Sequence, residues 1–83
     1  MTYDEYRAHA DWAIARIQAN LNNVRIVHAE ATRTYIQDGL DSEIQTATHR
    51  LQLQLAKALT AASALHLAIG TCQHRAETRK ERS

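Results

Sequence analysis

The sequence predicts an all-α protein, a long antiparallel helical hairpin in which residues 1–83 form a single helical domain. The chain contains no proline and two glycines, and Gly39 lies almost at its midpoint. On both sides of Gly39, apolar residues recur at intervals of three and four, which is the spacing of one face of an α-helix. Fifteen alanines favour helix strongly but bury little surface, so the predicted core is thin.

The first helix is predicted over about residues 3–38. Thr2 can cap its beginning, and Glu5, three residues later, completes a capping box. Gly39 can end the helix because glycine adopts the left-handed conformation without strain, and we expect a Schellman motif there. Both boundaries are therefore visible in the sequence.

Three asparagines lie near the middle of this helix, at Asn20, Asn22 and Asn23. The asparagine side chain competes for backbone hydrogen bonds and therefore favours caps and turns over helix interiors. Two interpretations follow. In one, the helix is continuous and the asparagines face solvent or a polar seam. In the other, the helix kinks near Asn20–Asn23 and the chain forms three helices.

A turn at residues 39–41 separates the two helices, and the second helix is predicted over about residues 42–79. Asp41 can cap its beginning. A connection of only about three residues places the helices side by side and antiparallel. The basic C-terminal end at residues 75–83 suits the negative end of the helix dipole. Gly70 costs roughly 1 kcal/mol inside a helix and marks a point where the helix could fray.

The first helix carries two apolar stripes. The second stripe, at Trp12, Ala15, Ala19 and Ile26, is rotated by roughly a right angle or more from the first. A helix with two such faces contacts more than one neighbour. The first stripe is the natural face toward the second helix, and it consists of Tyr3, Tyr6, Ala10, Ile14, Ile17, Leu21, Val24, Ala31 and Tyr35.

The second helix has more apolar surface than one neighbouring helix can cover. No Asp, Glu, Lys or Arg occurs from Ala58 through Gln73, and a helix that is apolar on nearly all sides is buried on nearly all sides. The simplest solution is a homodimer in which two hairpins form a four-helix bundle. The alternative is burial against a foreign protein. The residues predicted to form the core or the dimer contact are Leu51, Leu53, Leu55, Leu59, Leu65, Leu67 and Ile69.

No catalytic, cofactor-binding or metal-binding motif is present, and we predict that the chain is not an enzyme. The five histidines include no pair at i, i+3 or i+4, the spacing that a helical zinc site needs. His28 falls on the inner stripe of the first helix, where we expect it to bond to a neighbouring residue. Cys72 lies on the main apolar stripe of the second helix and His74 on a different side, so we expect Cys72 to be a small core residue. This stripe consists of Ile44, Ala47, Leu51, Leu55, Ala58, Ala62, Leu65, Ile69, Cys72 and Ala76.

The composition also predicts a location in the cytoplasm with no membrane contact. A lone cysteine allows no disulfide within the chain and fits a reducing compartment. The N-terminus is acidic and lacks an apolar run, so it differs from a secretory signal. The apolar stretch Leu51–Ile69 contains glutamine, lysine, threonine, serine and histidine, which argues against a membrane span.

These observations favour a small non-enzymatic protein that binds another protein and regulates or inhibits it. Helical chains of this size without motifs are common among phage and mobile-element inhibitors of host machinery, including anti-CRISPR proteins. The predicted contacts are Trp12, Ile26, Tyr3 and Tyr6, because tryptophan and tyrosine are enriched at interface hot spots. The predicted partners are a second copy of the chain and a protein target.

Two alternative functions stay open. One is an RNA- or DNA-binding regulatory dimer of helical hairpins, with contacts at Arg75, Arg79, Lys80 and Arg82. A formal net charge of only +1 gives this alternative little support from the chain as a whole. The other alternative is a structural subunit of a larger assembly.

Overall fold

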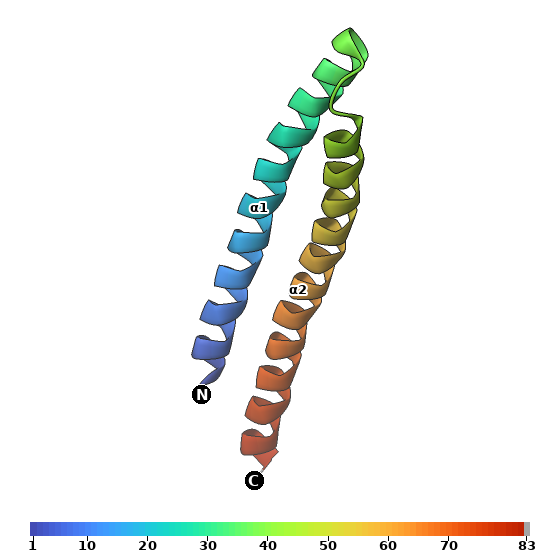
Figure 1. The fold of residues 1–83 in the computed structure, drawn as a ribbon. Helices are drawn as coiled ribbons and strands as arrows, with labels where there is room; N and C mark the ends of the chain where they lie inside the picture. Colours follow the sequence, from blue (N-terminus) through green and yellow to red (C-terminus); the bar gives the residue numbers. More distant parts are fainter. Residues whose placement is uncertain (83) are drawn as a thin grey trace.

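The protein is a hairpin of two long α-helices that lie side by side and antiparallel (Figure 1). The structure is a computed structural model that describes residues 1–82, and the side chain of Arg82 lies outside the described part. Helix α1 spans Tyr3–Asp38 and helix α2 spans Ser42–Arg82. The predicted all-α hairpin is confirmed. Helix α1 runs unbroken through Asn20–Asn23, so the interpretation with three helices is wrong.

The ends of α1 are fixed by one side chain and one backbone conformation. The Thr2 hydroxyl accepts a hydrogen bond from the Glu5 N–H at 3.2 Å, as an N-cap does, and it also donates to Glu5 Oε1 at 3.2 Å. At the other end, Gly39 has φ of 70° and donates its N–H to the Tyr35 carbonyl at 2.9 Å. That single bond defines the αL motif, in place of the Schellman motif that we expected.

The turn reverses the chain within three residues because two of them adopt left-handed backbone angles. Asp41 has φ of 63°, and its carbonyl accepts the N–H of Gln45 at 2.9 Å, which is the first bond of α2. Asp41 therefore occupies the predicted cap position. Aspartate is among the few residues other than glycine that tolerate this region. The three-residue turn holds the two helices next to each other.

The helices contact each other through a seam whose positions alternate between intervals of three and four residues, as in a coiled coil. Only Ala10, Leu21, Ala31 and Ile69 are buried among the hydrophobic residues that the structure describes. The seam positions of α1 are Tyr3, Arg7, Ala10, Ile14, Ile17, Leu21, Val24, His28 and Ala31. Those of α2 are Gln45, Thr48, Gln52, Leu55, Leu59, Ala62, His66, Ile69, Gln73 and Ala76. Half of the α2 positions are polar, so α2 turns a mixed face inward.

The hairpin is a rod with a large surface for its mass. It measures 70 × 15 × 14 Å between Cα atoms, and its radius of gyration is 19.3 Å, compared with about 12 Å for a compact domain of this length. Its accessible surface is 6482 Å², whereas a compact monomer of 9.4 kDa exposes about 5,000 Å². At the open end of the hairpin, α2 extends beyond the first residues of α1 (Figure 1). The chain therefore has surface that one copy leaves uncovered.

Length and composition alone would let α2 cross a membrane. Its most apolar stretch of 18 residues has a mean hydropathy of 1.3, and 6% of that stretch is buried in the hairpin. In the folded hairpin, however, this helix contacts a charged residue of α1, since His66 Nε2 lies 3.1 Å from Asp11 Oδ1. Charged side chains are costly in hydrocarbon, so a spanning α2 would have to leave α1.

Candidate interaction surfaces

One side of the seam is lined by uncharged residues from both helices, and we call it the apolar side. Its positions on each helix repeat every seven residues and flank the seam. In an antiparallel pair, these equivalent columns of the two helices border the same side. The column of α1 is Tyr6, Ala13, Asn20, Val27 and Thr34. The column of α2 is Ile44, Leu51, Ala58, Leu65 and Cys72.

The large side chains of the apolar side are well exposed in the single chain. The exposed fraction is 44% for Tyr6, 48% for Val27, 46% for Ile44, 42% for Leu51 and 52% for Leu65. A monomeric protein rarely leaves a continuous apolar strip of this length open to water. The apolar side is therefore a candidate contact surface.

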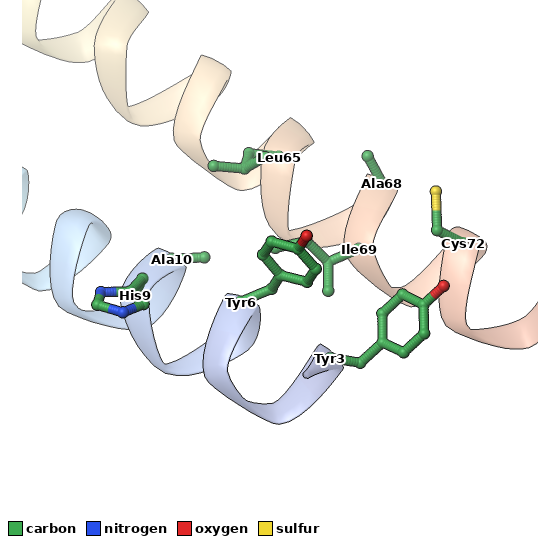
Figure 2. Close-up of a pocket in the computed structure, with 8 residues that line it drawn as sticks. All are labelled: Tyr3, Tyr6, His9, Ala10, Leu65, Ala68, Ile69 and Cys72. Carbon is green, nitrogen blue, oxygen red and sulfur yellow. The ribbon is translucent and has the colours of Figure 1, made fainter. Parts of the chain in front are cut away.

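Two grooves lie on this side, one near each end of the rod. The larger, about 520 Å³, is at the open end, where Tyr3 and Tyr6 of α1 face Leu65, Ile69 and Cys72 of α2. Figure 2 shows the two tyrosine rings reaching from α1 toward α2, with ring centroids 6.1 Å apart. The smaller, about 310 Å³, is near the turn and is lined by residues of both columns. The lining residues of the smaller groove are Ile26, Val27, Glu30, Ala31, Asp41 and Ile44.

The opposite side of the seam is polar, and we call it the polar side. Its α1 column includes Asp4 and Asp11, and Asp11 pairs with His66 of the seam at 3.1 Å. Arg7 lies 3.6 Å from Asp4, and it lines a shallow hollow on this side together with His66 and Leu67. The hairpin thus has one apolar side and one polar side.

A third surface is the outer face of α1, which points away from α2. Trp12 is 64% exposed and Ile26 is 69% exposed. The two residues are fourteen positions apart, so they lie on one line along the helix, about 21 Å from each other. Ala15 and Ala19 lie between them and are exposed. The Arg16 guanidinium lies 5.3 Å from the centre of the Trp12 ring, in a cation–π contact.

The four predicted partner contacts do not form one surface. Trp12 and Ile26 share the outer face of α1, whereas Tyr3 and Tyr6 line the groove between the helices at the open end. Val27 belongs to the apolar side, yet neither sequence stripe of the first helix contained it. The signal that could have found it is the seven-residue repeat that begins at Tyr6 and continues through Ala13, Asn20, Val27 and Thr34.

The predicted core and dimer residues of α2 also divide among surfaces. Ile69 is buried, and Leu55 and Leu59 are half-buried in the seam. Leu51 and Leu65 lie on the apolar side. Leu53 and Leu67 are exposed away from the apolar side. Leu67 lines the hollow on the polar side. The prediction that Cys72 is a core residue is wrong, because its side chain is exposed beside the larger groove.

The predicted nucleic-acid contacts lie on the part of α2 that extends past α1. Arg75 and Arg79 border a hollow with His74 and Thr78, and Lys80 is exposed nearby. Two acidic residues alternate with them, at positions 77 and 81. Basic and acidic side chains are therefore mixed here. The predicted contact at Arg82 lies outside the described side chains.

The histidines take structural positions along the rod. His28 Nδ1 lies 2.9 Å from Thr48 Oγ1 across the seam, where the sequence predicted a bond to a neighbour. The His28 and His49 rings have centroids 6.0 Å apart. Within residues 1–82, as far as their side chains are described, no three His, Cys, Asp or Glu residues gather as a metal site would require.

One exposed pair of residues on α1, Glu30 and Arg33, has pKa values shifted by a mutual contact. Arg33 donates hydrogen bonds to both carboxylate oxygens of Glu30, one of them at 3.1 Å. These bonds and the charge of Arg33 hold the pKa of Glu30 below its ordinary value of 4.5. The same contact raises the pKa of Arg33 above its ordinary value. Both groups are on the surface, so the pair supports helix α1 locally and forms no reactive site.

The comparisons with known proteins leave these surfaces as the only guide to function. No protein-family model, no curated protein and no solved structure matches the chain.

Proposed function

We propose that this chain is a small non-enzymatic protein that binds another protein and thereby regulates or inhibits it. The contact is the outer face of α1, centred on Trp12 and Ile26. The observation that supports this most is that the single tryptophan is 64% exposed on a helix face far from the seam. An exposed tryptophan gains little within its own chain and much in a protein interface.

The surroundings of Trp12 suit a protein contact. Ala15 and Ala19 lie between Trp12 and Ile26 on this face, so a partner helix or sheet could approach the backbone closely at these two positions. The contact of Arg16 with the indole ring limits its rotation before binding, which lowers the entropy lost on association. An anchor of this kind resembles the buried aromatic centre of a typical interface, with a charged residue at its border.

The shape of the molecule supports action by covering a partner. A rod 70 Å long with open grooves offers extended faces, and such faces can block a working surface of another protein. We therefore propose a regulator or inhibitor that acts in the cytoplasm, of the kind that phages and mobile elements direct at host machinery. A nucleic-acid regulator and an assembly subunit are the competing functions.

The test begins with identification of the target by affinity capture from host cells and mass spectrometry. The purified target is then titrated with the wild type, with Trp12→Ala and with Leu67→Ala as a control on the polar side. Trp12→Ala should weaken binding about 30-fold or more, as loss of a hot spot does, while Leu67→Ala should bind normally. Both variants should keep the helical circular dichroism spectrum.

Three outcomes would count against this function. Equal binding by Trp12→Ala and wild type would remove the outer face of α1 as the contact. Co-purification of material absorbing at 260 nm that is lost at high salt would favour nucleic-acid binding. A purified species much larger than a dimer in light scattering would favour a structural assembly.

A further inference from the structure

We infer that the apolar side is a self-association surface, through which two copies of this chain pair face to face with the turn of one at the open end of the other. This inference concerns a different surface from the one in the proposed function, so either can fail without the other. The occupant of the apolar side is therefore a second copy, and the outer face of α1 stays open for a target.

The accessible surface that two copies would bury on pairing is large enough for a stable dimer. Each copy exposes 6482 Å², whereas a compact protein of twice the mass exposes about 8,300 Å², so a pair that compact would bury about 4,700 Å². The columns of the apolar side each span about 28 residues, or about 42 Å of helix, and the rod is 15 Å wide, which gives a lower figure of about 1,300 Å² over both copies. The lower figure lies within the range of specific, stable interfaces, which begins at about 1,200 Å², and the upper figure lies within the range of obligate homodimers, which begins at about 2,000 Å².

The apolar side of one copy is complementary to the apolar side of another. Neither column contains Asp, Glu, Lys or Arg between Tyr6 and Thr34 or between Ile44 and Cys72, so pairing along these stretches buries no charge from the columns. The nearest charged residues are Glu30 and Asp41, which border the smaller groove, and Arg79, the next position of the α2 column, which lies past the beginning of α1. The pair would also cover the larger groove beside Leu65 and Cys72, which is open in one copy. The resulting four-helix bundle has the architecture that suits helices with apolar residues on more than one side.

The charges at the two ends of the rod favour one orientation of the two copies over the other. Residues 38–43 at the turn include three acidic residues and no basic one. Residues 74–81, where α2 passes the beginning of α1, include three basic and two acidic residues. Pairing with turns at opposite ends keeps the two acidic turns apart and places each beside the open end of the other copy, where residues 74–81 together with Asp4, Glu5 and Arg7 mix both signs of charge. Pairing with both turns at one end would place like charges together.

The register follows from contacts across the seam. Asp11 with His66 and His28 with Thr48 place Asn20 level with position 56 or 57 of α2. Asn20 is also at the middle of α1, so full overlap of the two α1 helices places the two-fold axis beside it. The Asn20 amide can then pair with its equivalent in the second copy, as a single buried asparagine does when it fixes register in a coiled coil.

The same register fixes one further contact and one separation between the two copies. Leu65 of one copy lies between Ile44 and Leu51 of the second copy. The two Cys72 side chains lie at opposite ends, about 45 Å apart along the bundle. Leu67, only two residues from Leu65, stays outside the contact on the polar side. The chain therefore contains its own matched control.

The first experiment measures mass by light scattering behind a sizing column, together with circular dichroism. Wild type and Leu67→Lys should both have a mass of about 19 kDa, twice the 9.4 kDa chain. Leu65→Lys should dissociate at least about 100-fold more readily, because it buries an unpaired charge in the pair. A wild-type mass of 9.4 kDa at high concentration, or equal dissociation of the two lysine variants, would overturn the inference.

A second measurement serves if Leu65→Lys unfolds. The melting temperature of the wild type should rise with protein concentration, since association stabilises the folded state by mass action. A melting temperature that is independent of concentration would overturn the pairing. So would flotation of folded wild type with phosphatidylcholine vesicles as single chains, because a membrane would then be the occupant of the apolar side.

The third experiment tests the orientation with cysteines. Asn20→Cys combined with Cys72→Ala should form a disulfide-linked dimer under mild oxidation, because the two residues 20 meet at the axis. The wild type, with Cys72 alone, should stay uncrosslinked. Rapid linkage through Cys72 and none through residue 20 would overturn the arrangement with turns at opposite ends.

Discussion

Replacing each glycine with alanine should change the stability of the hairpin in opposite directions. At both Gly39 and Gly70, an added methyl group would meet no atom within 4 Å. Packing therefore contributes little at either position, and the backbone conformation decides the sign. Gly39 has φ of 70°, which an L-residue adopts only with strain. Gly70 lies in the interior of α2, where glycine is the weaker helix former.

The magnitudes follow from these conformations. Gly39→Ala should destabilise the fold by about 1–2 kcal/mol, the cost of a left-handed conformation for an L-residue. Gly70→Ala should stabilise it by about 0.5–1 kcal/mol. For a domain of this size, 1 kcal/mol shifts the melting temperature by about 4–8 °C. The two variants should thus melt about 6–24 °C apart on either side of the wild type.

Thermal unfolding followed by circular dichroism at 222 nm measures both shifts. The samples need equal protein concentration, because self-association would make the melting temperature depend on it. Gly39→Asn serves as a control, since asparagine tolerates the left-handed region better than alanine. An unchanged or higher melting temperature for Gly39→Ala would refute the reasoning, because it would mean that α1 does not end in a left-handed residue.

Three other predictions concern the seam and the surface of α1. Leu21 is 5% exposed, so Leu21→Ala should lower the free energy of unfolding by about 2–5 kcal/mol. Its urea unfolding midpoint should lie at a lower urea concentration than that of the wild type. The Thr48 hydroxyl donates to a backbone carbonyl of α2 at 2.8 Å, so it accepts a hydrogen bond from His28 Nδ1. In wild type, ¹⁵N NMR should therefore find His28 as the Nδ1–H tautomer. In Thr48→Val, His28 should lose this tautomer preference. Because Arg33 lowers the pKa of Glu30 in the folded chain, this pair stabilises the fold above the unfolded pKa, and the benefit is lost as pH falls through the folded value. An NMR titration of the Glu30 carboxyl should give a midpoint below 4.5, and Arg33→Gln should return it to the ordinary range.

Much of the fold was predictable because it depends on local rules. Helix α1 begins after the N-cap Thr2 and ends at Gly39, which has a left-handed conformation. Both signals act within a few positions along the chain. The three asparagines did not break α1, since helix propensity is a weak preference that contacts along a long helix override. The antiparallel arrangement followed from the shortness of the turn.

The identity of the inward face of α2 could not be predicted from the sequence. Periodicity gives the angle between residues on one helix, but it does not say which of two neighbouring apolar columns faces α1. The prediction gave Leu51 and Leu65 to the core or the dimer contact without deciding between the two, whereas the seam uses the adjacent columns, with Gln52 and His66 among their members. The choice depends on packing between the helices, which a single sequence does not encode in its spacing. Cys72 was misplaced for the same reason.

The hairpin also has a mechanical consequence, because residue 1 and residue 82 lie at the same end of the rod (Figure 1). A pull on the two termini would load the layers of the seam one after another, beginning at the open end. The helices would therefore unzip toward the turn at low force, whereas a pull between one terminus and the turn would stretch a single helix along its own axis and would not open the seam layer by layer.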